Sequence, residues 1–167
     1  LYESINGDLS GLNVCIDCAN GASAAVARQL FPRLGAKCTF IGVEPDGKNI
    51  NAGVGSTHLD NLEKAVVEGG FDCGIAFDGD ADRCLACDEK GQELDGDKII
   101  ALLAMAMKDK GRLDGNTAVV TVMSNLGFVK YMESQGINTE KTAVGDRYVL
   151  ENMRENGYAI GGEQSGH

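Results

Sequence analysis

The sequence is organised around one acidic stretch, Gly74-Ile75-Ala76-Phe77-Asp78-Gly79-Asp80-Ala81-Asp82-Arg83, in which an apolar run ends where three aspartates begin. In an extended or turning segment, side chains two residues apart point to the same side, so these carboxylates are expected to converge. Their charges repel one another unless a cation lies between them. Carboxylate oxygens suit a hard divalent ion, and Mg²⁺ commonly leaves positions open for water or phosphate. We therefore predict a Mg²⁺ site made by Asp78, Asp80 and Asp82.

Arg83 follows the third aspartate directly. Its planar guanidinium suits phosphate oxygens, so an arginine beside a metal site favours phosphate chemistry. A simpler alternative is a solvated turn between two strands. A calcium EF-hand is excluded because Arg83 takes the place of the required loop glycine and both flanks, residues 71–77 and 84–87, have a strand pattern.

Composition bounds the class of protein. The chain has 167 residues, 43% of them hydrophobic, which is ample for a buried core, and its formal charge is −10 without a lysine or arginine cluster. No nucleic acid or anionic membrane surface is therefore expected as a partner. The longest apolar run, Ile99 to Met107, is too short to span a bilayer, and the start at Leu1 lacks a signal-peptide pattern. We expect a cytoplasmic protein, read as an excerpt because position 1 is not Met.

The six cysteines include two pairs with Cys-x-x-Cys spacing, Cys15 with Cys18 and Cys84 with Cys87. Neither pair encloses the Gly or Pro of a zinc knuckle, and the pairs lie far apart in the sequence. We interpret these four cysteines and the remaining two, Cys38 and Cys73, as free thiols in a reducing compartment.

Hydrophobic patterning predicts alternating strands and helices in two consecutive units. In the first unit, strands are expected at residues 12–18, 37–43, 72–77 and 83–88, helices at 23–34 and 59–68, and an irregular loop at 44–57. The last two of these strands flank the acidic turn and are expected to be antiparallel. In the second unit, helices are expected at residues 98–108, 126–134 and 146–156, and strands at 117–123, 137–144 and 158–160.

The fold class that follows is α/β, with two consecutive units, each a mixed, mainly parallel sheet with covering helices. We place an end of a preceding segment or linker at residues 1–11, the first unit at 12–92 and the second at 93–167.

Two loops resemble those of a known family. Residues 78–83 resemble the metal loop of the α-D-phosphohexomutases, and Gly162-Glu163-Gln164-Ser165-Gly166-His167 resembles their sugar-recognition loop. Four further segments match the branch of this family that acts on an amino-sugar phosphate, in the expected order: Asn49-Ile50-Asn51, Gly55-Ser56-Thr57-His58, residues 121–127 and residues 144–149. Members of the family have four domains, and the resemblance makes residues 12–92 the second domain and residues 93–167 most of the third.

The resemblance implies an isomerase that is an intramolecular phosphotransferase. It would interconvert glucosamine 6-phosphate and glucosamine 1-phosphate through a phosphoserine and a bisphosphorylated sugar, with Mg²⁺ as cofactor. The serine would lie in the first domain, upstream of Leu1, and a phosphate-binding loop in the fourth, downstream of His167. The expected partners are therefore a phosphosugar substrate and the remaining domains, and the chain alone is expected to be inactive.

The resemblance also implies roles for single residues. Asp78, Asp80 and Asp82 would ligate the metal, and Arg83 would assist on a nonbridging phosphate oxygen. The sugar hydroxyls would be bound by two residues of the second loop, Glu163 and Ser165.

Other assignments keep their alternatives. His167 is either a general acid or base for the sugar hydroxyl or the ordinary start of the next strand. Arg147 either lies near the substrate or, with Asp146, caps a helix. His58 is expected to organise its loop or to face the cleft, and Asn20 to cap a helix.

Two rival functions use the same acidic stretch. A haloacid-dehalogenase-like phosphatase would use Asp78 as its nucleophile, although that family normally continues with Thr or Val and a glycine-containing turn where residues 81–83 read Ala-Asp-Arg. A non-catalytic metal-binding module would function without other domains to complete a cleft.

Overall fold

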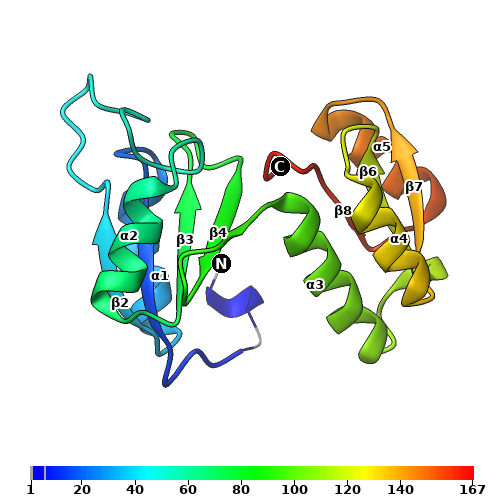
Figure 1. Ribbon diagram of the computed structural model, residues 1–167, viewed down its shortest axis with the longest axis horizontal. Helices are drawn as coiled ribbons and strands as arrows, with labels where there is room; N and C mark the ends of the chain where they lie inside the picture. Colours follow the sequence, from blue (N-terminus) through cyan, green and yellow to red (C-terminus); the bar gives the residue numbers. More distant parts are fainter. Residues whose placement is uncertain (1, 6) are drawn as a thin grey trace. The chain divides into compact units, whose positions relative to one another are not determined.

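The computed structural model describes residues 2–5 and 7–167. Contacts divide the chain into two compact units, one that ends at Leu94 and one from Asp95 to His167 (Figure 1). Each unit is a sheet with helices, which confirms the predicted α/β class.

The first unit contains one five-stranded sheet with the order β2-β1-β3-β4-β5. Its elements are η1 Tyr2–Ser4, β1 Asn13–Asp17, α1 Ser23–Arg33, β2 Lys37–Ile41, α2 Asp60–Gly69, β3 Cys73–Phe77, β4 Cys84–Asp88 and β5 Glu93–Leu94. Strand β1 pairs in parallel with both β2 and β3, whereas β3 and β4 are antiparallel, as predicted for the strands around the acidic turn. The two-residue strand β5 was not predicted.

Strand β1 explains why both faces of this sheet are covered. Successive side chains of a strand point to opposite faces. Cys15 packs with Leu62 and Val66 of α2, while Val14 and Ile16 pack in a second cluster with Ala24 and Ala27 of α1. Residues 14–16 are all apolar because a helix covers each face of the sheet at this strand.

Parallel pairing also brings three loops together. The carboxyl ends of β1, β2 and β3 meet at one edge of the sheet. The loops that leave there are residues 18–22, 42–59 and 78–83. Ligand sites of open α/β sheets form at this kind of edge.

The second unit has a three-stranded sheet with the order β7-β6-β8, in which both pairings are parallel. Its elements are α3 Gly96–Asp109, η2 Asp114–Asn116, β6 Thr117–Thr121, α4 Leu126–Ser134, β7 Asn138–Thr142, α5 Asp146–Asn156 and β8 Ile160–Gly161. The last strand begins two residues later than predicted, because Tyr158 N still donates to Met153 O of α5 (3.0 Å). None of the described helices is both long and apolar enough to cross a membrane.

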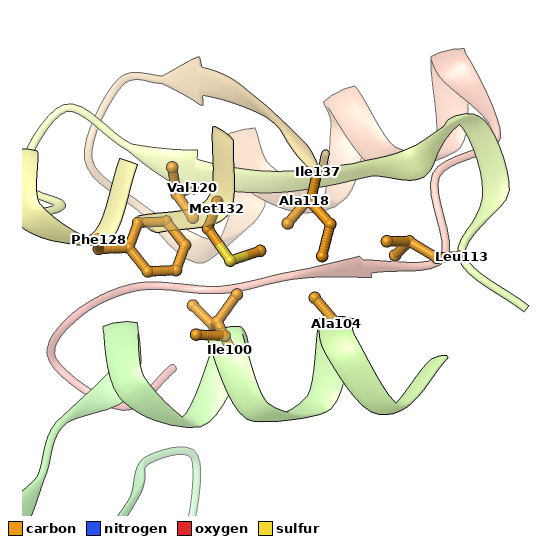
Figure 2. Packing of buried hydrophobic residues seen from close by; sticks show 9 residues of the cluster. Ile100, Ala104, Leu113, Ala118, Val120, Phe128, Met132 and Ile137 are labelled. Carbon is orange, nitrogen blue, oxygen red and sulfur yellow. The ribbon is translucent and has the colours of Figure 1, made fainter. Parts of the chain in front are cut away.

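One core holds the second unit together (Figure 2). Ile100 and Ala104 of α3 pack with Phe128 and Met132 of α4 over the β6 strand. On β8, a Cβ added at Gly161 would lie 2.7 Å from Val149 and 2.8 Å from Met153, both on α5. Helix α5 therefore packs so closely on β8 that this position has room only for glycine.

Two predicted helix caps are wrong. Helix α1 is preceded by Ala22, and the Asn20 side chain instead joins loops, accepting from Glu44 N (3.0 Å) and donating to Asn49 O (3.3 Å). Helix α5 is preceded by Gly145, so Asp146 lies in its first turn and makes no capping hydrogen bond. In both cases the chain turns one or two residues away from where the polar residue predicted it.

Candidate functional site

The 78–83 loop leaves the carboxyl end of β3 and gathers the three predicted metal ligands. One oxygen from each of Asp78, Asp80 and Asp82 lies within 4.8 Å of the others. The Asp78 side chain is buried, whereas Asp80 and Asp82 are exposed. The convergence that the spacing predicted is therefore present, and ligation of a metal stays a prediction.

A strained turn produces this convergence. Ala81 has φ of 63°, in the left-handed region, and its N–H donates to Asp78 O (3.2 Å). A residue with a Cβ pays about 1–2 kcal/mol in this conformation. Backbone strain of this kind is concentrated at binding and catalytic sites.

Arg83 fixes the buried carboxylate. Its Nε donates to Asp78 Oδ2 (2.8 Å) and its backbone N–H donates to Oδ1 (3.2 Å). Burial by itself raises the pKa of Asp78, but the hydrogen bonds and charge of Arg83, together with a hydrogen bond with Asp82, outweigh it, so the pKa is lowered from its ordinary value. Asp78 is therefore ionised at neutral pH, and Arg83 lies beside the aspartates as the prediction requires. Its action on a phosphate oxygen stays a prediction.

The 42–59 loop at the same sheet edge is held by Asp17, a residue that the sequence analysis did not single out. Asp17 is completely buried; its Oδ1 accepts from Ala19 N (2.9 Å) and its Oδ2 from Gly55 N (2.8 Å). Phe77 O accepts from Ser56 N (3.0 Å), which ties the same loop to the end of β3. The available signal was an acidic residue at the carboxyl end of an otherwise apolar strand.

The glycine-rich loop after β8 is closed by hydrogen bonds of its own. Glu163 N donates to His167 O (2.8 Å), and Gly166 N donates to Glu163 O (3.0 Å). The Glu163 side chain is buried, and its Oε1 accepts from Gly145 N (2.9 Å) at the start of α5. Glu163 therefore ties two loops of the sheet edge together, and its contact with a sugar stays a prediction.

The other predicted substrate residues are exposed. Ser165 and His167 lie on the surface of the same loop. Arg147 Nε donates to Glu151 Oε1 on its own helix (2.8 Å), and this pairing raises the pKa of Arg147. His58 is exposed, and its N–H closes a turn to Gly55 O (2.9 Å), consistent with a residue that organises its loop.

Asp97 is a second buried carboxylate whose importance the sequence did not reveal. It is 3% exposed and accepts from Ser124 Oγ (2.7 Å) and Asn125 N (2.8 Å). Beside it, Gly96 N donates to Gln164 O (3.0 Å). The first turn of α3 thus holds both the β6–α4 loop and the glycine-rich loop.

All six cysteines are free thiols, as predicted. Cys15 and Cys87 are completely buried, and burial raises the pKa of each thiol to about 11. They are therefore protonated at neutral pH and serve as small apolar groups.

Comparison with known proteins agrees with this arrangement. The family model described as phosphoglucomutase/phosphomannomutase, alpha/beta/alpha domain II, matches residues 2–91, and the model for domain III matches residues 95–167. A phosphoglucosamine mutase of Arthrobacter sp. (strain FB24) is 60% identical over 95% of the chain, and one of Acetivibrio thermocellus is 58% identical over 100% of it.

The chain spans 35% and 37% of the length of these two relatives. Among solved structures, a phosphoglucomutase/phosphomannomutase family protein from Burkholderia thailandensis has a TM-score of 0.83 at 25% identity, covering 96% of this chain and 35% of that protein. Because the two family models match nearly all of the sequence, the chain belongs to the phosphoglucomutase/phosphomannomutase family.

Proposed function

We propose that the chain supplies the metal-binding and sugar-recognition domains, residues 12–92 and 93–167, of an enzyme that interconverts glucosamine 6-phosphate and glucosamine 1-phosphate. The observation that carries the proposal is the cluster of three aspartate oxygens beside Arg83. The identity to relatives named phosphoglucosamine mutase supports the amino sugar as substrate. The phosphoserine and the loop that grips the substrate phosphate belong, in this proposal, to other domains.

The residues of the 78–83 loop fit a hard divalent cation such as Mg²⁺. All the clustered donors are carboxylate oxygens, with no thiolate or imidazole among them. Asp78 would be held by Arg83 as the rigid ligand, while the exposed Asp80 and Asp82 complete the set. When bound, the cation would offset the negative charge that develops on phosphoryl oxygens during transfer.

The remaining residues would handle the substrate. Arg83, whose Nε is paired with Asp78, would present the rest of its guanidinium group to a nonbridging phosphate oxygen. Glu163 and Ser165 accept hydrogen bonds from sugar hydroxyls, while His167 holds or releases the proton that a hydroxyl exchanges during transfer. Arg147 would reach the substrate only by breaking its ion pair with Glu151. This pair is exposed and therefore weak.

The phosphatase alternative fits this geometry poorly. A nucleophilic Asp78 needs an oxygen directed at the phosphorus, but both of its oxygens accept hydrogen bonds from Arg83. Trapping of aluminium fluoride or beryllium fluoride on Asp78 in the presence of Mg²⁺ would support that alternative instead.

The metal site is tested by Mg²⁺ titration of the 167-residue chain. We expect weak binding, and Asp80→Asn is expected to reduce affinity at least about tenfold because it removes one charged ligand. Asp109→Asn, which neutralises an exposed aspartate outside the loop, serves as the control and should leave affinity unchanged. Isothermal calorimetry measures both variants. Equal binding by the wild type and Asp80→Asn would contradict the site.

Turnover separates the mutase from the metal-binding module. A longer protein that contains this segment and the proposed flanking domains should convert glucosamine 6-phosphate to the 1-phosphate, faster than glucose or mannose phosphates. The 167-residue chain by itself should show no turnover. Activity of the isolated chain would refute the proposed division of labour, and an inactive longer protein that still binds Mg²⁺ would favour the module.

A further inference from the structure

Gly79, between the first two aspartates, is enclosed by two other loops. On one side its carbonyl oxygen accepts from Ala22 N (2.8 Å), and a Cβ on Gly21 would lie only 2.3 Å from that oxygen. On the other side, a Cβ on Gly79 itself would lie 2.6 Å from Ile50 Cδ1 and 2.9 Å from Asn51 Nδ2. The position of the 78–83 loop is therefore limited by the two loops that contact Gly79.

Asn51 is held in an unusual state at this contact. Its φ is 57°, in the left-handed region, and its N–H donates to Ala19 O (3.0 Å). Its side-chain oxygen Oδ1 is buried and has no hydrogen-bond partner among the described residues. A buried acceptor without a donor is destabilising and calls for an explanation.

Stability alone does not explain an asparagine here. Glycine would adopt the same φ without strain and would bury no unpaired acceptor. What glycine lacks is the carboxamide that lies against Gly79. The side chain therefore serves the neighbouring loop and not the stability of its own.

We propose that Asn51 is a positioning residue for the 78–83 loop. It acts through Gly79: the carboxamide blocks displacement of Gly79 away from Ala22 and so keeps the Asp78 and Asp80 carboxylates together. Both contacts of Gly79 involve the loop that leaves β1: Ala22 belongs to this loop, and Asn51 N donates to Ala19 O in it. The inference rests on the proposed function of the three aspartates as a cation site.

The main test uses Mn²⁺ as a probe of the 167-residue chain, with affinity measured by electron paramagnetic resonance of the free ion. Asn51→Gly keeps the backbone conformation and removes the carboxamide, and it is expected to weaken Mn²⁺ binding about tenfold, as loss of outer-shell support does at metal sites. Asn51→Asp keeps the shape of the side chain and should bind at least as tightly as the wild type.

Two controls isolate the contact with Gly79. Asn61→Ala removes a hydrogen bond from Asn61 Nδ2 to Gly53 O (2.8 Å) in the same loop without touching Gly79. Asn116→Gly changes another asparagine with left-handed φ, 48°, in the second unit. Both controls should bind Mn²⁺ like the wild type. Equal weakening in Asn61→Ala would overturn the proposal, because general loosening of the loop would then suffice.

Hydrogen exchange in the presence of a chelator gives a readout without any cation. In Asn51→Gly, the amides of residues 79–83 should exchange several-fold faster, while those of β1 and β3 keep their rates. Faster exchange across the whole unit, or unchanged exchange in the loop, would overturn the positioning role. If the wild type fails to bind Mn²⁺, the cation site is wrong, and this measurement still decides the role of Asn51.

Discussion

Four buried carboxylates each fix a loop at the edge of a sheet. Asp17 accepts from Gly55 N, Asp78 from Arg83, Asp97 from Asn125 N, and Glu163 from Gly145 N. A buried charge is costly unless hydrogen bonds and partners compensate it. Asp17, Asp97 and Glu163 find donors in a neighbouring loop, and Asp78 finds them in Arg83 at the end of its own loop, so the cost of burial becomes a constraint on where each loop lies.

The buried thiol of Cys15 leads to a prediction about alkaline pH. Burial, and to a smaller extent Asp17, raises the pKa of Cys15 to about 11. In the unfolded chain the pKa of a cysteine thiol is about 8.5. The folded pKa is the higher one, so stability from the protonated thiol is complete below about pH 8.5 and is lost as pH rises toward 11. The free energy of unfolding should fall over this range.

Cys15→Ala should reduce that fall, measured by urea unfolding at several pH values between 7 and about 10.5, a range chosen to cover the two pKa values. Cys38→Ala is the comparison, because the Cys38 thiol is partly exposed and its pKa is raised less. The same pH slope for the wild type and Cys15→Ala would show that this thiol does not contribute.

At the scale of elements, the helix starts of the second unit carry the loops. Helix α3 begins with Asp95, whose Oδ1 accepts from Lys98 N (3.0 Å), and helix α4 begins with Asn125, whose Oδ1 accepts from Gly127 N (2.6 Å). Asp97, in the first turn of α3, joins these two helix starts. The two aspartates therefore differ in role: Asp95 caps its own helix, whereas Asp97 connects the starts of two helices.

This difference predicts unequal losses of stability. Asp97→Ala leaves Ser124 Oγ and Asn125 N without their buried acceptor and should cost about 2–3 kcal/mol of unfolding free energy. Asp95→Ala removes a helix cap and an exposed hydrogen bond from Gln164 Nε2 (3.2 Å), and should cost about 1 kcal/mol. Chemical denaturation of both variants checks the order. A larger loss for Asp95→Ala would mean that capping, and not the connection between helices, dominates here.

Helices with a strong pattern were well predicted from sequence, and very short strands were not. The predicted bounds of α4 and α5 match those in the structure. Strands β5 and β8 have two residues each. No periodicity can be read from two residues, and these strands exist only because β4 and β6 offer partners.

At the scale of the whole molecule, each core cluster formed by the described residues lies within one unit. Leu62 belongs to a cluster of the first unit and Met132 to the cluster of the second, and both side chains are fully buried. We therefore predict that the units unfold as separate cooperative transitions.

Leu62→Ala and Met132→Ala should each cost about 3 kcal/mol, because each leaves a cavity in a packed core. In differential scanning calorimetry, each variant should lower the transition of its own unit and leave the other in place. A single transition that both substitutions lower equally would contradict independent unfolding.

The sequence by itself determined the alternation of strands and helices, the antiparallel pair around the acidic turn and the convergence of three aspartates, because these follow from local periodicity and spacing. Tertiary structure decided which polar residues are buried and what they hold. Asn20 and Asp146 looked like caps but are not, while Asp17, Asn51 and Asp97 gained their roles from loops distant in the sequence. Such roles depend on parallel pairing, which brings together the ends of strands that are separated by whole helices, and no local pattern encodes that proximity.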